Sequence, residues 1–247
     1  MHRYFDRILR GTEHEDNLVI VQFLKGMIGQ RFSFLNYYKE IPVSYDATLM
    51  SVENEMAEFE VHDYQAKVIT MERRALIYSH EKSPVKEDLV ADAFYVNVAK
   101  KRVILCKFGY ARISSDRRRF VRVLLDIRVE ADLIFEGGII TGIINDISLG
   151  GAAMSITSCD QLTAGMAANM FIKLPDSQTG AIDEVGLSAT IVKIEGTEAH
   201  YTCYVEFHPE KQSQQQISYF INQRQVEIIK ELKEENLQLA APRGAQH

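Results

Sequence analysis

Hydrophobic and polar residues alternate in the second half of the chain. Every odd position from Val121 to Phe135 is apolar, whereas most even positions are charged. A period of two is typical of a strand with one buried face, because successive side chains of a strand point to opposite sides. The pattern predicts one half-buried antiparallel strand over residues 121–135.

The following residues predict more strands and then a helix. Gly137-Gly138 suits a hairpin turn, and Pro209 opens a helical pattern. Strands separated by turn residues are expected at Ile139–Ile147, Ala152–Ile156, Ala168–Leu174, Gly186–Ile194 and His200–Phe207. This spacing predicts a small β-barrel followed by a helix.

The predicted C-terminal helix carries an apolar stripe. Its residues recur at multiples of three or four positions: Ile217, Ile221, Ile228 and Leu232. We expect the stripe to pack on the chain's own barrel, and self-association through it, giving a homodimer, is the alternative.

The first half of the chain also predicts β structure. Its short strand-like stretches are separated by polar breaks, which favours a barrel or sandwich. These stretches are Glu58–His62, Ala75–Ser79, Ala93–Val98 and Arg102–Lys107. Asn17–Ile28 suits a buried helix or strand, and we favour the helix. Phe108–Asp116 has little periodicity and is interpreted as a connection.

The expected fold is therefore mainly β, with two small β-barrels in tandem, the second a six-stranded antiparallel barrel followed by an α-helix. A chain of 247 residues suits two domains. The expected parts are an N-terminal β domain at 1–110 with a leading helix at 16–29, a linker at 111–117, a second domain with its C-terminal helix at 118–238 and a flexible tail at 239–247.

Composition narrows the classes of function. The net charge of −6 argues against a general nucleic-acid or membrane-surface binder, because both need a basic field. No apolar run is long enough to span a membrane, and the start lacks a signal-peptide pattern, so we expect a cytoplasmic protein. The three cysteines are far apart and are interpreted as reduced packing residues.

A local excess of arginine stands out against this acidity. Arg117–Arg128 contains five arginines and one acid, Asp126. The simpler interpretation is a solvated strand edge whose charges deter pairing with other strands. A second segment, Asn145–Gly151 (NDISLGG), combines an acid and a hydroxyl with paired glycines. Taken alone, it suits an ordinary turn capped by Asp146 and Ser148.

Together the two segments resemble a known signature. Arg118-x-x-x-Arg122, followed about two strands later by Asp146-x-Ser148-x-x-Gly151, is similar to the RxxxR and (D/N)xSxxG motifs of PilZ domains. The resemblance covers about Ser115–Leu232, and order, spacing and predicted context agree. The N-terminal β domain is only generally similar to those that precede PilZ modules in flagellar-brake-type proteins.

The resemblance implies cyclic di-GMP as the ligand and no cofactor or metal. Arginine can pair with phosphate, match a guanine edge and stack on a base, which suits Arg118 and Arg122. Asp146 would accept hydrogen bonds from guanine N–H groups, and Ser148 would donate to the ligand. The remaining residues expected at the site are Arg117, which the family associates with a stacked pair of ligands, and Gly150 and Gly151, which would leave room for the ligand.

The expected function is that of a receptor which passes the signal to a protein partner by changing the interdomain orientation. Motility, biofilm and exopolysaccharide control are the implied outputs, through a flagellar motor or polysaccharide-synthesis component. The alternative is a PilZ-like interaction adaptor that binds the nucleotide weakly or not at all. An enzyme is disfavoured, because Ser148 lacks a G-x-S-x-G elbow and no phosphate-binding loop is present. Nucleic-acid binding is disfavoured because Phe120 is the one aromatic platform among the arginines.

Overall fold

The computed structural model describes residues 4–113, 120–176, 179–197 and 200–240, with side chains as far as residue 234. These residues form two compact units, each described separately below. The first comprises residues 4–38, 42–113 and 231–240, and the second comprises Lys39–Ile41 and residues 120–230. The limits predicted for the linker and the tail remain predictions.

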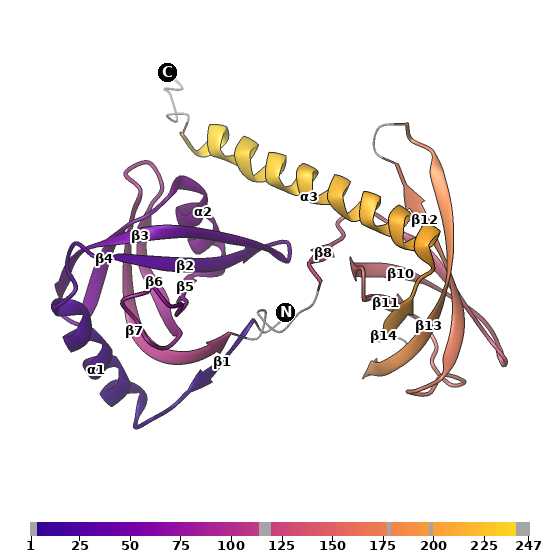
Figure 1. Ribbon diagram of the computed structural model, residues 1–247, viewed down its shortest axis with the longest axis horizontal. Helices are drawn as coiled ribbons and strands as arrows, with labels where there is room; N and C mark the ends of the chain where they lie inside the picture. Colours follow the sequence, from indigo (N-terminus) through magenta and orange to yellow (C-terminus); the bar gives the residue numbers. More distant parts are fainter. Residues whose placement is uncertain (1–3, 114–119, 177–178, 198–199, 241–247) are drawn as a thin grey trace, which may run out of the picture. The chain divides into compact units, whose positions relative to one another are not determined.

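The first unit is built on an antiparallel barrel (Figure 1). Its described strands are β1 (Phe5–Ile8), β2 (Arg31–Tyr38), β3 (Ile41–Glu53), β4 (Met56–Glu60), β5 (Arg74–Ile77), β6 (Leu89–Asn97) and β7 (Arg102–Ile113). Strands β2 to β7 close in the order β7-β4-β3-β2-β5-β6, because β6 also pairs with β7. Strand β1 pairs with the C-terminal end of β7, at residues 110–113.

Two helices accompany this barrel, α1 (Glu13–Lys25) and α2 (Asp63–Glu72). Helix α1 begins at a capping box, in which Thr12 accepts from the Glu15 amide at 3.2 Å while the Glu15 carboxylate accepts from the Thr12 amide at 2.8 Å. Both helices contribute to the hydrophobic core: Ile20, Val21 and Leu24 from α1, and Ala66 and Ile69 from α2. Helix α1 overlaps the leading helix expected at 16–29, but it begins three residues earlier and ends at Lys25.

The second unit contains another closed barrel (Figure 1). Its described strands are β8 (Arg122–Leu124), β9 (Glu130–Phe135), β10 (Gly138–Ser148), β11 (Gly151–Ile156), β12 (Ala167–Pro175), β13 (Ile182–Thr197) and β14 (His200–His208). Strands β9 to β14 close in the order β11-β14-β13-β12-β9-β10, because β10 also pairs with β11. Strand β8 pairs with the end of β10.

The predicted strand over 121–135 is correct at its ends and wrong in its middle. Strand β9 pairs with Gly138–Ile143, and β8 pairs with Asp146–Ser148, so residues 125–129 face only two residues of β10. Residues 125–129 therefore leave the sheet as a loop, which we call the excursion. Its two ends are fixed by hydrogen bonds from Leu125 N to Asn145 O and from Ile144 N to Val129 O, both 2.8 Å. The apolar alternation continues through it, which explains why the sequence pattern did not reveal it.

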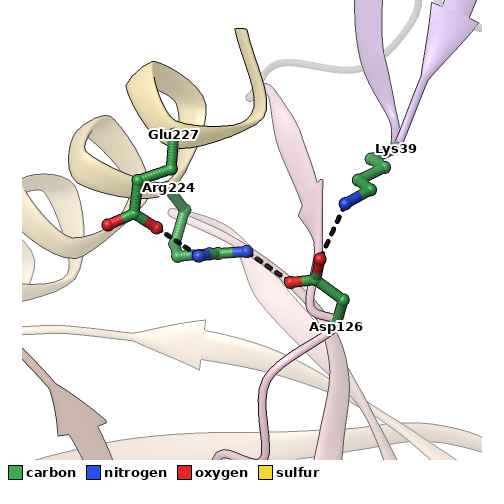
Figure 2. Close-up of polar contacts among 4 residues, drawn as sticks. All are labelled: Lys39, Asp126, Arg224 and Glu227. Carbon is green, nitrogen blue, oxygen red and sulfur yellow. Dashed lines mark hydrogen bonds and ion pairs between the residues drawn. The ribbon is translucent and has the colours of Figure 1, made fainter. Parts of the chain in front are cut away.

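Asp126, within this excursion, is the centre of an ion-pair network (Figure 2). It accepts from Lys39 Nζ at 2.7 Å and from the guanidinium of Arg224, which also pairs with Glu227. Arg224 and Glu227 lie on α3 (Lys211–Ala240), and the Arg224 side chain is buried. The network therefore attaches the excursion to the C-terminal helix.

The apolar stripe of α3 is buried within the chain. Ile217, Phe220, Ile221, Ile228 and Leu232 are each at most 5% exposed. Ile217, Ile221 and Ile228 belong to the second unit, as expected for packing on its own barrel, whereas Leu232 belongs to the first unit. The homodimer stays a prediction. No described helix is both long and apolar enough to cross a membrane.

The predicted architecture, two β-barrels in tandem of which the second is six-stranded and is followed by a C-terminal helix, is confirmed, with 52% of residues in strands. The first barrel also closes with six strands. The hydrophobic pattern of the sequence did not reveal β1, β2, β3 or α2 as separate elements. Strand β7 continues to Ile113, whereas the first domain was expected to end at residue 110. Of the cysteines, Cys203 is buried, which raises its pKa to about 11, and the other two are half-buried.

Asp126→Asn should lower stability in a pH-dependent way. The Lys39 hydrogen bond, together with the charge of Arg224, holds the pKa of Asp126 below its ordinary value, against the opposing effect of burial. A depressed folded-state pKa stabilises the fold above the unfolded value of about 3.9 and loses that effect as the pH falls through the folded value. We expect a loss of roughly 1 kcal/mol at pH 7, since Asp126 is partly exposed.

Chemical denaturation at several pH values checks this expectation. The parent and Asp126→Asn curves should converge at acid pH, where both side chains are neutral. Glu136→Gln, at an exposed position of the β9–β10 turn, serves as the control and should differ little from the parent. An Asp126→Asn deficit that is constant from pH 7 to pH 2 would contradict the role of the charge.

Candidate ligand-binding site

The two segments singled out in the sequence meet on neighbouring strands. Arg122 on β8 lies directly opposite Ser148 on β10, and Leu124 lies opposite Asp146. The Arg122 Nε atom is 3.3 Å from Asp146 Oδ1. The described part of the arginine segment and the acid–hydroxyl–glycine segment therefore lie side by side.

A β-bulge decides which way Asp146 points. The register of β10 against β11 shifts between Ile144 and Asp146, so Asn145 is the extra residue. Ile144 and Ile147 are both buried, at 1% and 0% exposure, although they are three positions apart. Without the bulge, Asp146 would follow Ile144 into the barrel interior. The bulge instead places Asp146 and Ser148 on the outer face, opposite in direction to Ile147.

Asp146 is buried despite its outward direction. Its side chain is 1% exposed, whereas that of Arg122 is 28% exposed. A buried carboxylate needs a charged or hydrogen-bonding partner, because desolvation is otherwise costly. Asp146 is therefore suited to orient the Arg122 guanidinium, which remains accessible to a ligand.

Ser148 and Gly150 form a tight turn beneath an aromatic ring. The Ser148 hydroxyl accepts from the Gly150 amide at 3.3 Å and donates to the Gly151 carbonyl at 3.2 Å. A Cβ at Gly150 would lie 2.9 Å from Cδ2 of Phe120. Phe120 thus packs on the turn and adds a second contact between the two segments.

Gly151 makes a close contact with the neighbouring strand. A Cβ there would lie 2.2 Å from the carbonyl oxygen of Val205 on β14. Gly151 therefore allows β14 to approach β11 closely, and the space beside it is occupied by protein backbone. Gly151 therefore has a packing role, and the expectation that it leaves room for a ligand stays a prediction.

Arg117 and Arg118 lie outside the described residues. Their expected roles therefore remain predictions. Glu206, near the end of β14, lies directly opposite Gly151 and is exposed at the same outer face. Among the described residues, no group of three or more His, Cys, Asp or Glu side chains is arranged to hold a metal ion.

This barrel, with an arginine segment at its start and the acid–hydroxyl–glycine turn beside it, has the features of a ligand-binding β domain. Residues 116–223 match the family model described as PilZ domain. This segment of the chain is a PilZ domain. The match supports the interpretation of the chain as a cyclic di-GMP receptor or effector.

Several solved structures resemble the chain at low identity. MotI/DgrA, the inhibitor of motility from Bacillus subtilis, is 15% identical over 81% of this chain and 97% of its own, with a TM-score of 0.41. YcgR from Escherichia coli, in complex with c-di-GMP, is 11% identical over 94% and 96%, with a TM-score of 0.42. MrkH from K. pneumonia, also as a c-di-GMP complex, is 15% identical over 91% and 97%, with a TM-score of 0.41. No curated protein sequence matches the chain.

Gly151→Ala should destabilise the second barrel because the added methyl group collides with the backbone of Val205. Overpacking of this kind costs about 1–3 kcal/mol. Thermal and chemical unfolding should detect the loss without any ligand present. Gly26→Ala is the matched control, since Gly26 has a helical φ of −78° and only ordinary contacts around its Cβ position. Equal stability of the two variants would contradict the packing role.

Proposed function

We propose that the chain is a receptor for cyclic di-GMP, and that the ligand binds on the outer face of β8 and β10. The observation that carries the proposal is the meeting of Arg122, Asp146 and Ser148 at one place within the PilZ domain. Arg118, four positions before Arg122, completes the signature in the sequence. Arg117 precedes it.

The chemistry of these side chains suits a cyclic dinucleotide. A guanidinium presents several donors in a fixed plane, so it can bind a phosphate or the O6/N7 edge of guanine with two hydrogen bonds. Asp146 supplies the acceptor that guanine N–H groups require, and it is held beside Arg122 before any ligand arrives. A site whose charges are already oriented loses less entropy on binding.

Binding is proposed to change the orientation of the second barrel relative to the first. The support lies in the sequence: the arginine segment follows the last strand of the first barrel after only three residues, 114–116. A ligand shifts such an equilibrium only if it binds one arrangement more tightly. Small-angle scattering should give different profiles with and without cyclic di-GMP, and identical profiles would count against this step.

The output is proposed to be a cytoplasmic protein partner in motility, biofilm or exopolysaccharide control. A receptor of this kind alters the partner through binding, and cyclic di-GMP itself should be recovered unchanged after incubation. Hydrolysis of the dinucleotide would instead support the enzyme interpretation. A pull-down with and without ligand would identify proteins whose capture depends on it.

Calorimetric titration with cyclic di-GMP tests the site. A charge-assisted hydrogen bond contributes about 1.5–3 kcal/mol, so Arg118→Ala and Arg122→Ala should each weaken binding by roughly ten- to a hundredfold or more. The same titration counts ligands, and Arg117 predicts a stacked pair per chain. One ligand per chain would exclude the pair.

Arg128→Ala is the matched control for charge in the same segment. Arg128 is 72% exposed and pairs with Glu130, outside the proposed site. Its removal should leave affinity within about twofold of the parent. If Arg118→Ala and Arg122→Ala also left the affinity for cyclic di-GMP within about twofold of the parent, the site assignment would be wrong. If the parent chain itself did not bind, the adaptor alternative would replace the receptor.

A further inference from the structure

The outer face of the second barrel carries a row of side chains that continues from Asp146. Asp146 lies opposite Ala153 on β11, Ala153 opposite Tyr204 on β14, and Tyr204 opposite Lys193 on β13. Residues directly opposite each other in antiparallel strands project to the same side of the sheet. We call these four residues the outer row. The row starts at Asp146 in the proposed ligand site and ends at Lys193, which lies outside the signature motifs.

A second β-bulge turns Lys193 into this row. The register of β13 against β14 shifts between Ile191 and Lys193, so Val192 is the extra residue and is 52% exposed. Ile191 is fully buried, and an unbroken alternation would point Lys193 into the barrel as well. The two bulges, at Asn145 and Val192, thus bring an acid and a base to one outer face. Bulges often redirect a side chain next to a functional site.

Tyr204 is placed between these charges. Lys193 Nζ lies 4.4 Å from the centre of its ring and donates to Glu195 at 2.8 Å. The pKa of Tyr204 is raised by partial burial, by its hydrogen bond to Glu195 and, more weakly, by the charge of Asp146. The phenol is therefore within electrostatic reach of Asp146, with only the methyl group of Ala153 between them in the row.

We propose that Tyr204 and Lys193 contact cyclic di-GMP directly, the Tyr204 ring by stacking on a guanine and the Lys193 ammonium by pairing with a phosphate. The inference rests on the proposed function and extends it. Adjacent strands lie about 4.8 Å apart, so Tyr204 is roughly 10 Å from Asp146 along the row. A ligand with two bases and two phosphates on one ring can engage both places at once.

The chemistry of the outer row complements the signature residues. Asp146 and Ser148 can form hydrogen bonds with the polar edge of a base, whereas the Tyr204 ring offers a flat π surface on which any base can stack. Glu195 keeps Lys193 ion-paired before binding. A phosphate that takes the place of Glu195 would preserve one charged partner for the lysine, and the Glu195 carboxylate, which is 57% exposed, would be solvated by water.

A single tryptophan reporter tests the stacking directly, because the natural chain contains no Trp. In Tyr204→Trp, titration with cyclic di-GMP should quench the fluorescence in a saturable way, as expected when an indole stacks on guanine. Tyr219→Trp is the control, since Tyr219 lies on α3, is 51% exposed and bonds to Gln223. Equal quenching in both variants would overturn the stacking contact.

Affinity measurements complete the test. Base–aromatic stacking predicts that Tyr204→Ala weakens binding roughly ten- to a hundredfold, while Tyr204→Phe stays within about threefold of the parent. Lys193→Ala should weaken binding roughly tenfold. Lys173→Ala, which removes a lysine paired with Glu130 and Asp132 on another part of the barrel, should have little effect.

The outcomes separate this inference from the proposed function. If Tyr204→Ala and Lys193→Ala bound like the parent while Arg122→Ala did not, the inference would fail and the receptor would stand. If the folded parent chain bound no cyclic di-GMP, both would fail. Should Tyr204→Ala unfold, the fluorescence of Tyr204→Trp and the affinity of Tyr204→Phe still decide, because loss of binding in the phenylalanine variant would exclude a role through stacking.

Discussion

The candidate site depends on the pairing of a buried carboxylate with a partly exposed guanidinium. Asp146 has almost no exposed surface, and Arg122 covers it from the neighbouring strand. Removing a carboxylate from water is unfavourable unless a cation or hydrogen-bond donors compensate. The buried Asp146 carboxylate therefore requires a cation beside it, and this requirement fixes the position of Arg122. The Arg122 guanidinium remains partly exposed, so an anionic ligand can reach it.

Irregularities in the barrel create this arrangement. A regular strand would send Asp146 inward after Ile144 and Lys193 inward after Ile191, into a core of aliphatic side chains. One extra residue in each strand reverses the direction. The charged side chains are thus available outside the barrel without any loss of interior packing. Gly151 also helps to position the site, because the absence of a Cβ allows β14 to lie close to the turn that follows Ser148.

The sequence predicted the parts of the fold that follow from alternation and turn chemistry. Strands β10 to β14 and helix α3 lie where the pattern placed them, and the signature residues Arg122, Asp146 and Ser148 do come together. The excursion at 125–129 escaped prediction because Leu125 and Ile127 maintain the apolar period while leaving the sheet. The two β-bulges could not be predicted for a related reason. A one-residue shift of register depends on how two strands pair, and the hydrophobic pattern of one strand carries no information about its partner. Tyr204 and Lys193 are separated in sequence from the signature and become neighbours only through that pairing.

The excursion also explains how the start of the PilZ domain is connected to its end. Arg122 is the first residue of β8, and Asp126 lies two residues beyond the end of that strand. One end of this short segment lies on Asp146, and the other is held by Arg224 of α3 and by Lys39 (Figure 2). Three residues of β8 pair with β10, and backbone hydrogen bonds from Leu124 N to Lys39 O and from Leu125 N to Asn145 O also hold the segment, together with the ion pairs at its two ends. A ligand that draws Arg122 toward a phosphate competes with the first of these pairs. Arg122 and Asp126 thus connect the signature strand β10 and helix α3 through one short segment of the chain.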